Sequence, residues 1–254
     1  MLTGIPDIKY SLLEYMYSKA AVLQQWDSRL LGISLDLPFT HLDATKPFYP
    51  PLRKDSAEGL DEPTSFLWQS PNSNAILYTG QKWTEIHGYV SRLLDMQVSQ
   101  SPISGFFSDK LVSKQYPSWL EHVLKLSRAR GYWTLYPSRI TAETLAVTHN
   151  ELYQAPEEYE DDIGGKSSTS MEGTLSDGAF IDTLPSRGAL LAFGDMPSLL
   201  WDGTSTFLDD LDSTAAEYTE EFRKAVGGCD LLTAQELLPR KSARDLFCMK
   251  QGQG

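Results

Sequence analysis

The sequence predicts an α/β layer fold in which amphipathic helices alternate with short apolar strands across residues 8–153. Three observations support this prediction. Apolar residues recur at helical spacing in several windows, short apolar or aromatic runs lie between those windows, and 41% of the 254 residues are hydrophobic, as is usual for a globular chain. A chain of this length can bury a full core, and no apolar run approaches the ~18 residues of a membrane-spanning helix.

The first expected elements are a helix and a strand. Apolar residues between 11 and 26 form one helical stripe, with Ser11 as the N-cap and Glu14 completing a capping box. Residues 29–35 are a short apolar run typical of a buried strand. Residues 38–63 are rich in Pro, Asp and Thr and are expected to form a long irregular excursion.

The middle of the chain repeats this alternation. Pro117 is placed where helices begin, and Gly131 where they end. In the helix predicted for 81–96, Trp83 and Leu94 are expected to lie on the buried face together with the other apolar residues. The expected elements are a strand at 74–79, a helix at 81–96, a helix at 117–130, a strand at 132–136 and a helix at 141–153.

The composition changes after residue 155. Acidic residues followed by Gly and Ser predict a solvated linker over 156–174. We therefore divide the chain into an α/β region at 1–155, this linker, and a small C-terminal module at 175–254 with an amphipathic helix at 208–226.

Cys229 and Cys248 lie within this C-terminal module. If oxidised, they would close a loop of about 20 residues, which adds ~3 kcal/mol of stability in the chain-entropy model. Two reduced structural thiols are the equally supported alternative, because the sequence does not reveal the compartment.

The charge balance excludes some partners. The chain has 22 Lys and Arg against 34 Asp and Glu, a formal net charge of −12. Because nucleic acids and anionic lipids are bound by clustered basic residues, we expect neither as a partner.

Most motif candidates fail on inspection. Residues 165–167 read Gly-Lys-Ser, but a phosphate-binding loop needs glycine at position 160, which is Glu. The acidic groups at 160–162 and 210–212 do not follow buried strands, so we interpret them as linker acids and as helix N-terminal acids. The four histidines form no zinc-binding pattern, and the sequence contains no hydrolase elbow or dinucleotide fingerprint.

The order of several segments resembles glycosyltransferases of the GT-A fold, in particular family-2-like members from fungi, plants and bacteria. The C-terminal segments 226–229 and 245–248 also resemble the tails of the fungal members. The segments that carry the main resemblance are 6–11, 31–35 with its Gly-Ile-Ser-Leu run, 66–71, 75–78, 83–89 and 119–137.

This resemblance implies a transferase that moves a sugar from a nucleotide-sugar to a glycan or protein acceptor. It implies a divalent cation, manganese or magnesium, held against the diphosphate as a Lewis acid. Asp7 matches the last acid of the family's metal motif, and His149 lies where some members bind metal or phosphate. Glu85 and Glu121 lie on acceptor-side segments, as candidates for the base that deprotonates an acceptor hydroxyl.

The departures from the family pattern define the alternatives. Ile5 and Pro6 stand where the preceding acids would be, and the sequence lacks the nucleotide-binding half that precedes the motif in the family. We therefore expect either the C-terminal part of a transferase, whose full-length relatives would reside in Golgi or secretory membranes, or a non-catalytic binding or scaffold module.

Each candidate residue also has a structural alternative. Asp7 would simply cap the first helix, and His149 would be a polar loop residue. Glu85 and Glu121 would be solvent-facing carboxylates on their helices.

Overall fold

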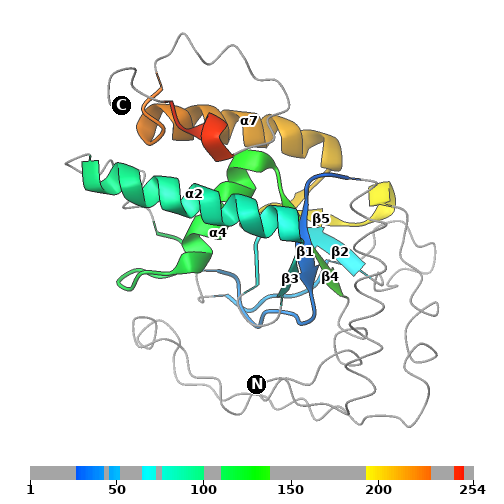
Figure 1. Cartoon of the computed structure of the whole chain (residues 1–254). Helices are drawn as coiled ribbons and strands as arrows, with labels where there is room; N and C mark the ends of the chain where they lie inside the picture. Colours follow the sequence, from blue (N-terminus) through cyan, green and yellow to red (C-terminus); the bar gives the residue numbers. More distant parts are fainter. Residues whose placement is uncertain are drawn as a thin grey trace, which may run out of the picture.

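The structure is a computed structural model, and it describes residues 27–42, 46–51, 65–72, 76–99, 110–137, 193–229 and 243–248. The helices expected at 11–26 and 141–153 and the acidic linker at 156–174 lie outside the described residues. Within the described residues, three long helices are grouped together beside a central sheet (Figure 1). The α/β class is therefore confirmed.

The sheet is mixed and has six strands in the order β3-β1-β4-β2-β5-β6. Strand β1 runs parallel to β4, and β2 runs parallel to β5, whereas the other neighbours are antiparallel. The strands are β1 (Leu30–Ser34), β2 (Ser65–Trp68), β3 (Ile76–Tyr78), β4 (Trp133–Pro137), β5 (Ser198–Leu199) and β6 (Ser205–Thr206).

A glycine allows the close approach of β1 and β3. A Cβ atom at Gly32 would lie 2.5 Å from the carbonyl oxygen of Leu77 on the neighbouring strand. Because Gly32 is also paired with Tyr78 in the antiparallel ladder, a larger residue here would disturb the pairing itself.

The helices are α2 (Gly80–Ser99), α4 (Trp119–Arg130) and α7 (Leu208–Ala225), with 3-10 turns η4 (Phe193–Asp195) and η6 (Ala243–Leu246). Helix α4 ends where the sequence predicts. Gly131 adopts a left-handed conformation with φ of 63°, and the Tyr132 N–H donates to the Ser127 carbonyl at 2.9 Å.

Two apolar clusters form the core. The larger one joins the inner faces of α2, α4 and α7 to β1, through residues such as Leu31, Leu93 and Phe222. The smaller one is aromatic, with Phe48 stacked on Trp68 at 4.3 Å between ring centroids. The helices each contribute one apolar face to the larger cluster, whereas β1 and β4 are buried along their whole length.

The described part of the C-terminal region belongs to the same sheet and core. Leu67 of β2 pairs with Ser198 of β5, and α7 packs against α4. The expected boundaries at 155 and 174 lie outside the described residues. None of the helices in the described part of the chain is long and apolar enough to cross a membrane.

Candidate functional site

Glu85 lies in a buried polar cluster between α2 and α4. Arg130 Nε donates to Glu85 Oε1 at 3.1 Å, and the Tyr132 hydroxyl donates to Oε2 at 2.6 Å. The side chain of Glu85 is only 10% exposed. The solvent-facing alternative for this residue is therefore wrong, because both of its oxygens are held by partners inside the protein.

The end of α4 creates this cluster. Arg130 is in the last turn of the helix, and the left-handed Gly131 turns the chain so that Tyr132 meets the same carboxylate. Arg130 Nη2 also contacts Asp245 Oδ1 of η6 at 2.5 Å. The guanidinium thus bridges two carboxylates from elements far apart in the sequence.

Lys82 completes the cluster from the first turn of α2. Its Nζ lies 3.5 Å from the centroid of the Tyr132 ring and 3.9 Å from Glu85 Oε2. Burial lowers the pKa of Lys82 from 10.5 to about 8, against the opposing attraction of Glu85. Burial, followed by the charge of Glu85, raises the pKa of Tyr132. Lys82 therefore loses its proton more readily than an exposed lysine does.

Glu121 is also buried, and it serves a different part of the molecule. Its Oε2 accepts hydrogen bonds from the backbone N–H groups of Leu111 at 3.0 Å and Val112 at 2.7 Å. Its Oε1 lies 3.9 Å from Lys125 Nζ. The solvent-facing alternative is wrong here as well, because Glu121 fixes the loop that leads into α4.

The two carboxylates do not form one site. Glu121 is in the first turn of α4, whereas Glu85 contacts Arg130 in its last turn. Nine residues of helix separate these positions, which corresponds to about 13 Å along the axis. An acceptor hydroxyl could therefore meet only one of them, and their role as catalytic base stays a prediction.

The other predicted site residues, Asp7 and His149, lie outside the described residues. In the described ranges, no group of three or more His, Cys, Asp or Glu side chains could hold a metal ion. The divalent cation therefore stays a prediction that depends on Asp7 and His149.

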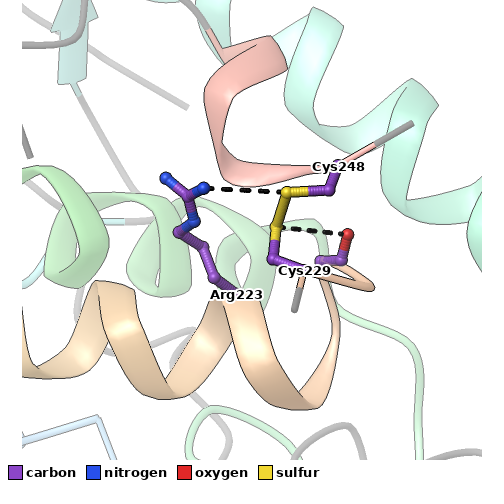
Figure 2. The surroundings of a disulfide bond; sticks show 4 residues. Arg223, Cys229 and Cys248 are labelled. Carbon is purple, nitrogen blue, oxygen red and sulfur yellow. Dashed lines mark hydrogen bonds between the residues drawn. A yellow bond between two sulfur atoms is a disulfide. The ribbon is translucent and has the colours of Figure 1, made fainter. Parts of the chain in front are cut away.

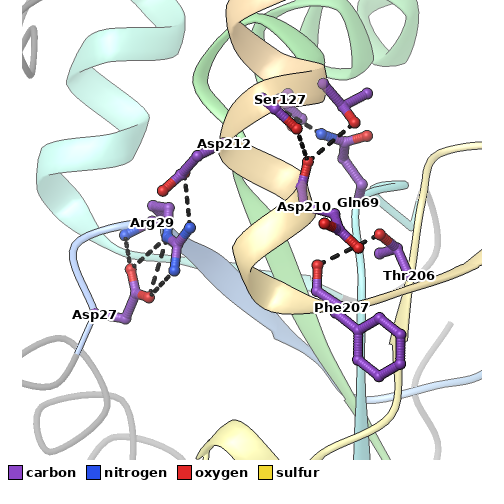
Figure 3. Close-up of polar contacts among 10 residues, drawn as sticks. Asp27, Arg29, Gln69, Ser127, Thr206, Phe207, Asp210 and Asp212 are labelled. Carbon is purple, nitrogen blue, oxygen red and sulfur yellow. Dashed lines mark hydrogen bonds and ion pairs between the residues drawn. The ribbon is translucent and has the colours of Figure 1, made fainter.

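Of the acids at 210–212, Asp210 lies in the first turn of α7 as expected, whereas Asp212 forms an ion pair that the sequence did not predict. Arg29 Nη1 donates to Asp212 Oδ1 at 2.7 Å, and the same guanidinium binds Asp27 (Figure 3). The Asp210 carbonyl accepts hydrogen bonds from the hydroxyls of Ser213 and Thr214. Asp212 therefore ties α7 to Arg29, the residue directly before β1.

A group of aromatic rings lies where β3, α2 and α4 meet. We call Tyr78, Trp83 and Trp119 the aromatic surface. The Tyr78 ring centroid is 5.7 Å from that of Trp83 and 6.4 Å from that of Trp119. Trp83 is 52% exposed and Trp119 is 50% exposed. Large exposed aromatic residues that contact one another mark binding surfaces more often than isolated ones do.

The exposure of Trp83 corrects the prediction that it lies on the buried face of its helix. Ile86 and Leu93 are buried as expected, but Trp83 and Leu94 are largely exposed. Trp83 lies in the first turn of α2, and β3 is an edge strand among the strands that the structure describes. A Trp in the first turn of each of two helices is the sequence signal that could have indicated this surface.

Comparisons of the chain with protein-family models, with curated proteins and with solved structures find no match.

Proposed function

We propose that this protein is glycosyltransferase-like and transfers a sugar from a nucleotide-sugar to an acceptor, with the described residues forming the acceptor side. The sheet order supports this proposal. The segments that carry the family resemblance form β1, β2, β3 with α2, and α4 with β4. Their four strands are neighbours in the order β3-β1-β4-β2.

The observation that carries the proposal is the aromatic surface. A sugar ring has an apolar C–H face that packs on an aromatic ring, while its hydroxyl groups remain in water. Two half-exposed Trp rings, each next to the Tyr78 ring, offer such faces to an acceptor. Because the chain carries a net charge of −12, the acceptor that fits best is a neutral glycan rather than an acidic one.

The chemistry assigned to this function rests on residues of the chain that remain candidates. A divalent cation, when bound, would stabilise the leaving nucleotide diphosphate, and Asp7 with His149 would hold it. Glu85 would have to exchange its present hydrogen bonds before it could accept a proton from an acceptor hydroxyl, and the buried Oε1 of Glu121 would have to become accessible.

Calorimetric titration of the full chain with neutral oligosaccharides tests the acceptor site. We expect Trp83→Ala and Trp119→Ala each to weaken binding by about 1 kcal/mol, or roughly fivefold in Kd. Phe207→Ala is the matched control, since Phe207 is an exposed aromatic residue on another element. If no glycan binds, or if the three variants behave alike, the aromatic surface is not an acceptor site.

A non-catalytic binding or scaffold module is the second candidate. It is favoured by the burial of Glu85 and Glu121. Both oxygens of Glu85 accept hydrogen bonds, and Glu121 Oε1, which has no hydrogen-bond partner, is buried. Glycan binding without nucleotide binding would support this candidate. Nucleotide release from a nucleotide-sugar, dependent on manganese and lost in Asp7→Ala, would support the transferase.

A further inference from the structure

Cys229 and Cys248 form a disulfide that joins the end of α7 to the residues after η6 (Figure 2). Backbone hydrogen bonds hold both cysteines in place. The Cys248 N–H donates to the Gly227 carbonyl at 2.8 Å, and the Cys229 N–H donates to the Arg223 carbonyl at 3.1 Å. Both cysteines are half-buried.

Arg223 is a buried cation beside this disulfide. Its exposure is 7%, and its Nη2 donates to Cys248 Sγ at 3.6 Å. Its Nε and Nη1 atoms are buried without a hydrogen-bond partner, and no described carboxylate forms an ion pair with it. A buried guanidinium without an anion is costly, so any negative charge that develops next to it is stabilised.

The surroundings of the two sulfur atoms are different. Cys229 Sγ lies 3.7 Å from the Gly227 carbonyl oxygen. As part of the disulfide it has no proton to donate, but as a thiol it could donate one to this oxygen. Cys248 Sγ instead faces a donor, the Arg223 guanidinium. After reduction, hydrogen bonding would therefore favour a neutral thiol at Cys229 and a thiolate at Cys248.

We propose that Cys229–Cys248 is a redox-active disulfide, reducible by dithiols, in which Cys248 departs as a thiolate held by Arg223. This inference does not depend on the proposed transferase function. A leaving thiol of low pKa accelerates thiol–disulfide exchange, so the guanidinium directs the attack to Cys229.

The exchange balances with a dithiol as the reductant. One thiolate of the dithiol attacks Cys229 Sγ, a mixed disulfide forms, and the bond between Cys229 and Cys248 breaks. The second sulfur of the dithiol then attacks the mixed disulfide and releases Cys229, which takes up a proton. The dithiol is oxidised to its disulfide, the protein gains two electrons, and one proton is released to water because Cys248 stays ionised.

The test is the pH dependence of alkylation in the reduced full chain. The protein is reduced with dithiothreitol and alkylated with iodoacetamide across a pH series, and each cysteine is quantified by peptide mass spectrometry. We expect Cys248 to react with an apparent pKa well below the ordinary ~8.5 of a thiol, and Cys229 to react near or above that value. In Arg223→Gln, the apparent pKa of Cys248 should rise by about 1 to 3 pH units.

Lys224→Gln is the matched control, because it removes one positive charge from the next, exposed position of α7. It should leave the pKa of Cys248 unchanged. Cys229→Ser, which keeps Arg223, gives a second test: its Cys248 should have a low pKa in the native state and an ordinary one in denaturing guanidinium chloride. Equal Cys248 pKa values in wild type and Arg223→Gln, or in native and denatured Cys229→Ser, would overturn the proposal. A reduced chain that unfolds would overturn it as well.

Discussion

Replacement of Glu85 by Gln tests how the buried cluster contributes to stability. The substitution keeps the shape of the side chain but removes the negative charge that faces Arg130, which is 7% exposed. Breaking a buried ion pair from one side generally costs about 3–5 kcal/mol. Arg130 keeps Asp245 as a second partner at 2.5 Å, so we expect a smaller loss of about 2 kcal/mol.

The control for this substitution is an exposed ion pair of the same kind. Glu220 and Lys224 contact each other one turn apart on the outer surface of α7. Glu220→Gln should cost about 0.5 kcal/mol or less, because exposed helical pairs contribute little. Urea unfolding of both variants, followed by circular dichroism, measures the difference. Equal stabilities of the two variants would refute the assignment of Glu85 to a structural ion pair.

Three further perturbations follow from the geometry. Gly32→Ala should lower the free energy of unfolding by about 2 kcal/mol, because its Cβ would lie 2.5 Å from a backbone carbonyl oxygen. Gly88→Ala, whose Cβ would have no atom within 4 Å, should stabilise α2 slightly. Urea titrations that rank the two variants in the opposite order would contradict the β1–β3 packing. The pKa of Lys82 is about 8 in the folded state and 10.5 in the unfolded state, so between these pH values the unfolded chain binds more protons and the stability should rise with pH. Lys82→Met should flatten this rise in thermal unfolding, and an unchanged slope would exclude Lys82 as its source. Reduction of Cys229–Cys248, which are 19 residues apart, should cost ~3 kcal/mol in chemical unfolding, and an unchanged midpoint would mean that the cross-link does not constrain the unfolded chain.

The elements predicted best are those whose own residues determine them. The helices expected at 81–96, 117–130 and 208–226 correspond to α2, α4 and α7, because each has an apolar stripe at helical spacing. The strands expected at 29–35 and 132–136 correspond to β1 and β4, which are fully buried apolar runs.

The strands that were missed depend on distant partners. Strand β2 follows the Pro-rich segment, and all four of its residues are buried, so it shows no alternation. Strands β5 and β6 are two residues each, and the hydrogen bonds that define them come from β2 and from each other. No local pattern identifies elements of this length.

The candidate site was harder to predict than the fold. Glu85 and Glu121 are charged residues on amphipathic helices, for which a solvent-facing position is the usual case. Their burial depends on partners such as Arg130, which lies 45 residues from Glu85. Likewise, the sequence left the pairing of the cysteines open because spacing alone cannot show whether they meet.

Thermal unfolding of the full chain, with and without manganese plus UDP or GDP, tests the transferase proposal most directly. A ligand that binds only the folded state at about 100-fold excess over its Kd stabilises it by ~2.7 kcal/mol. For a chain of this size the midpoint should then rise by about 5 to 10 °C. Asp7→Ala should abolish that rise. A cooperative transition with the same midpoint in the presence and absence of nucleotide would contradict the transferase and leave the binding module.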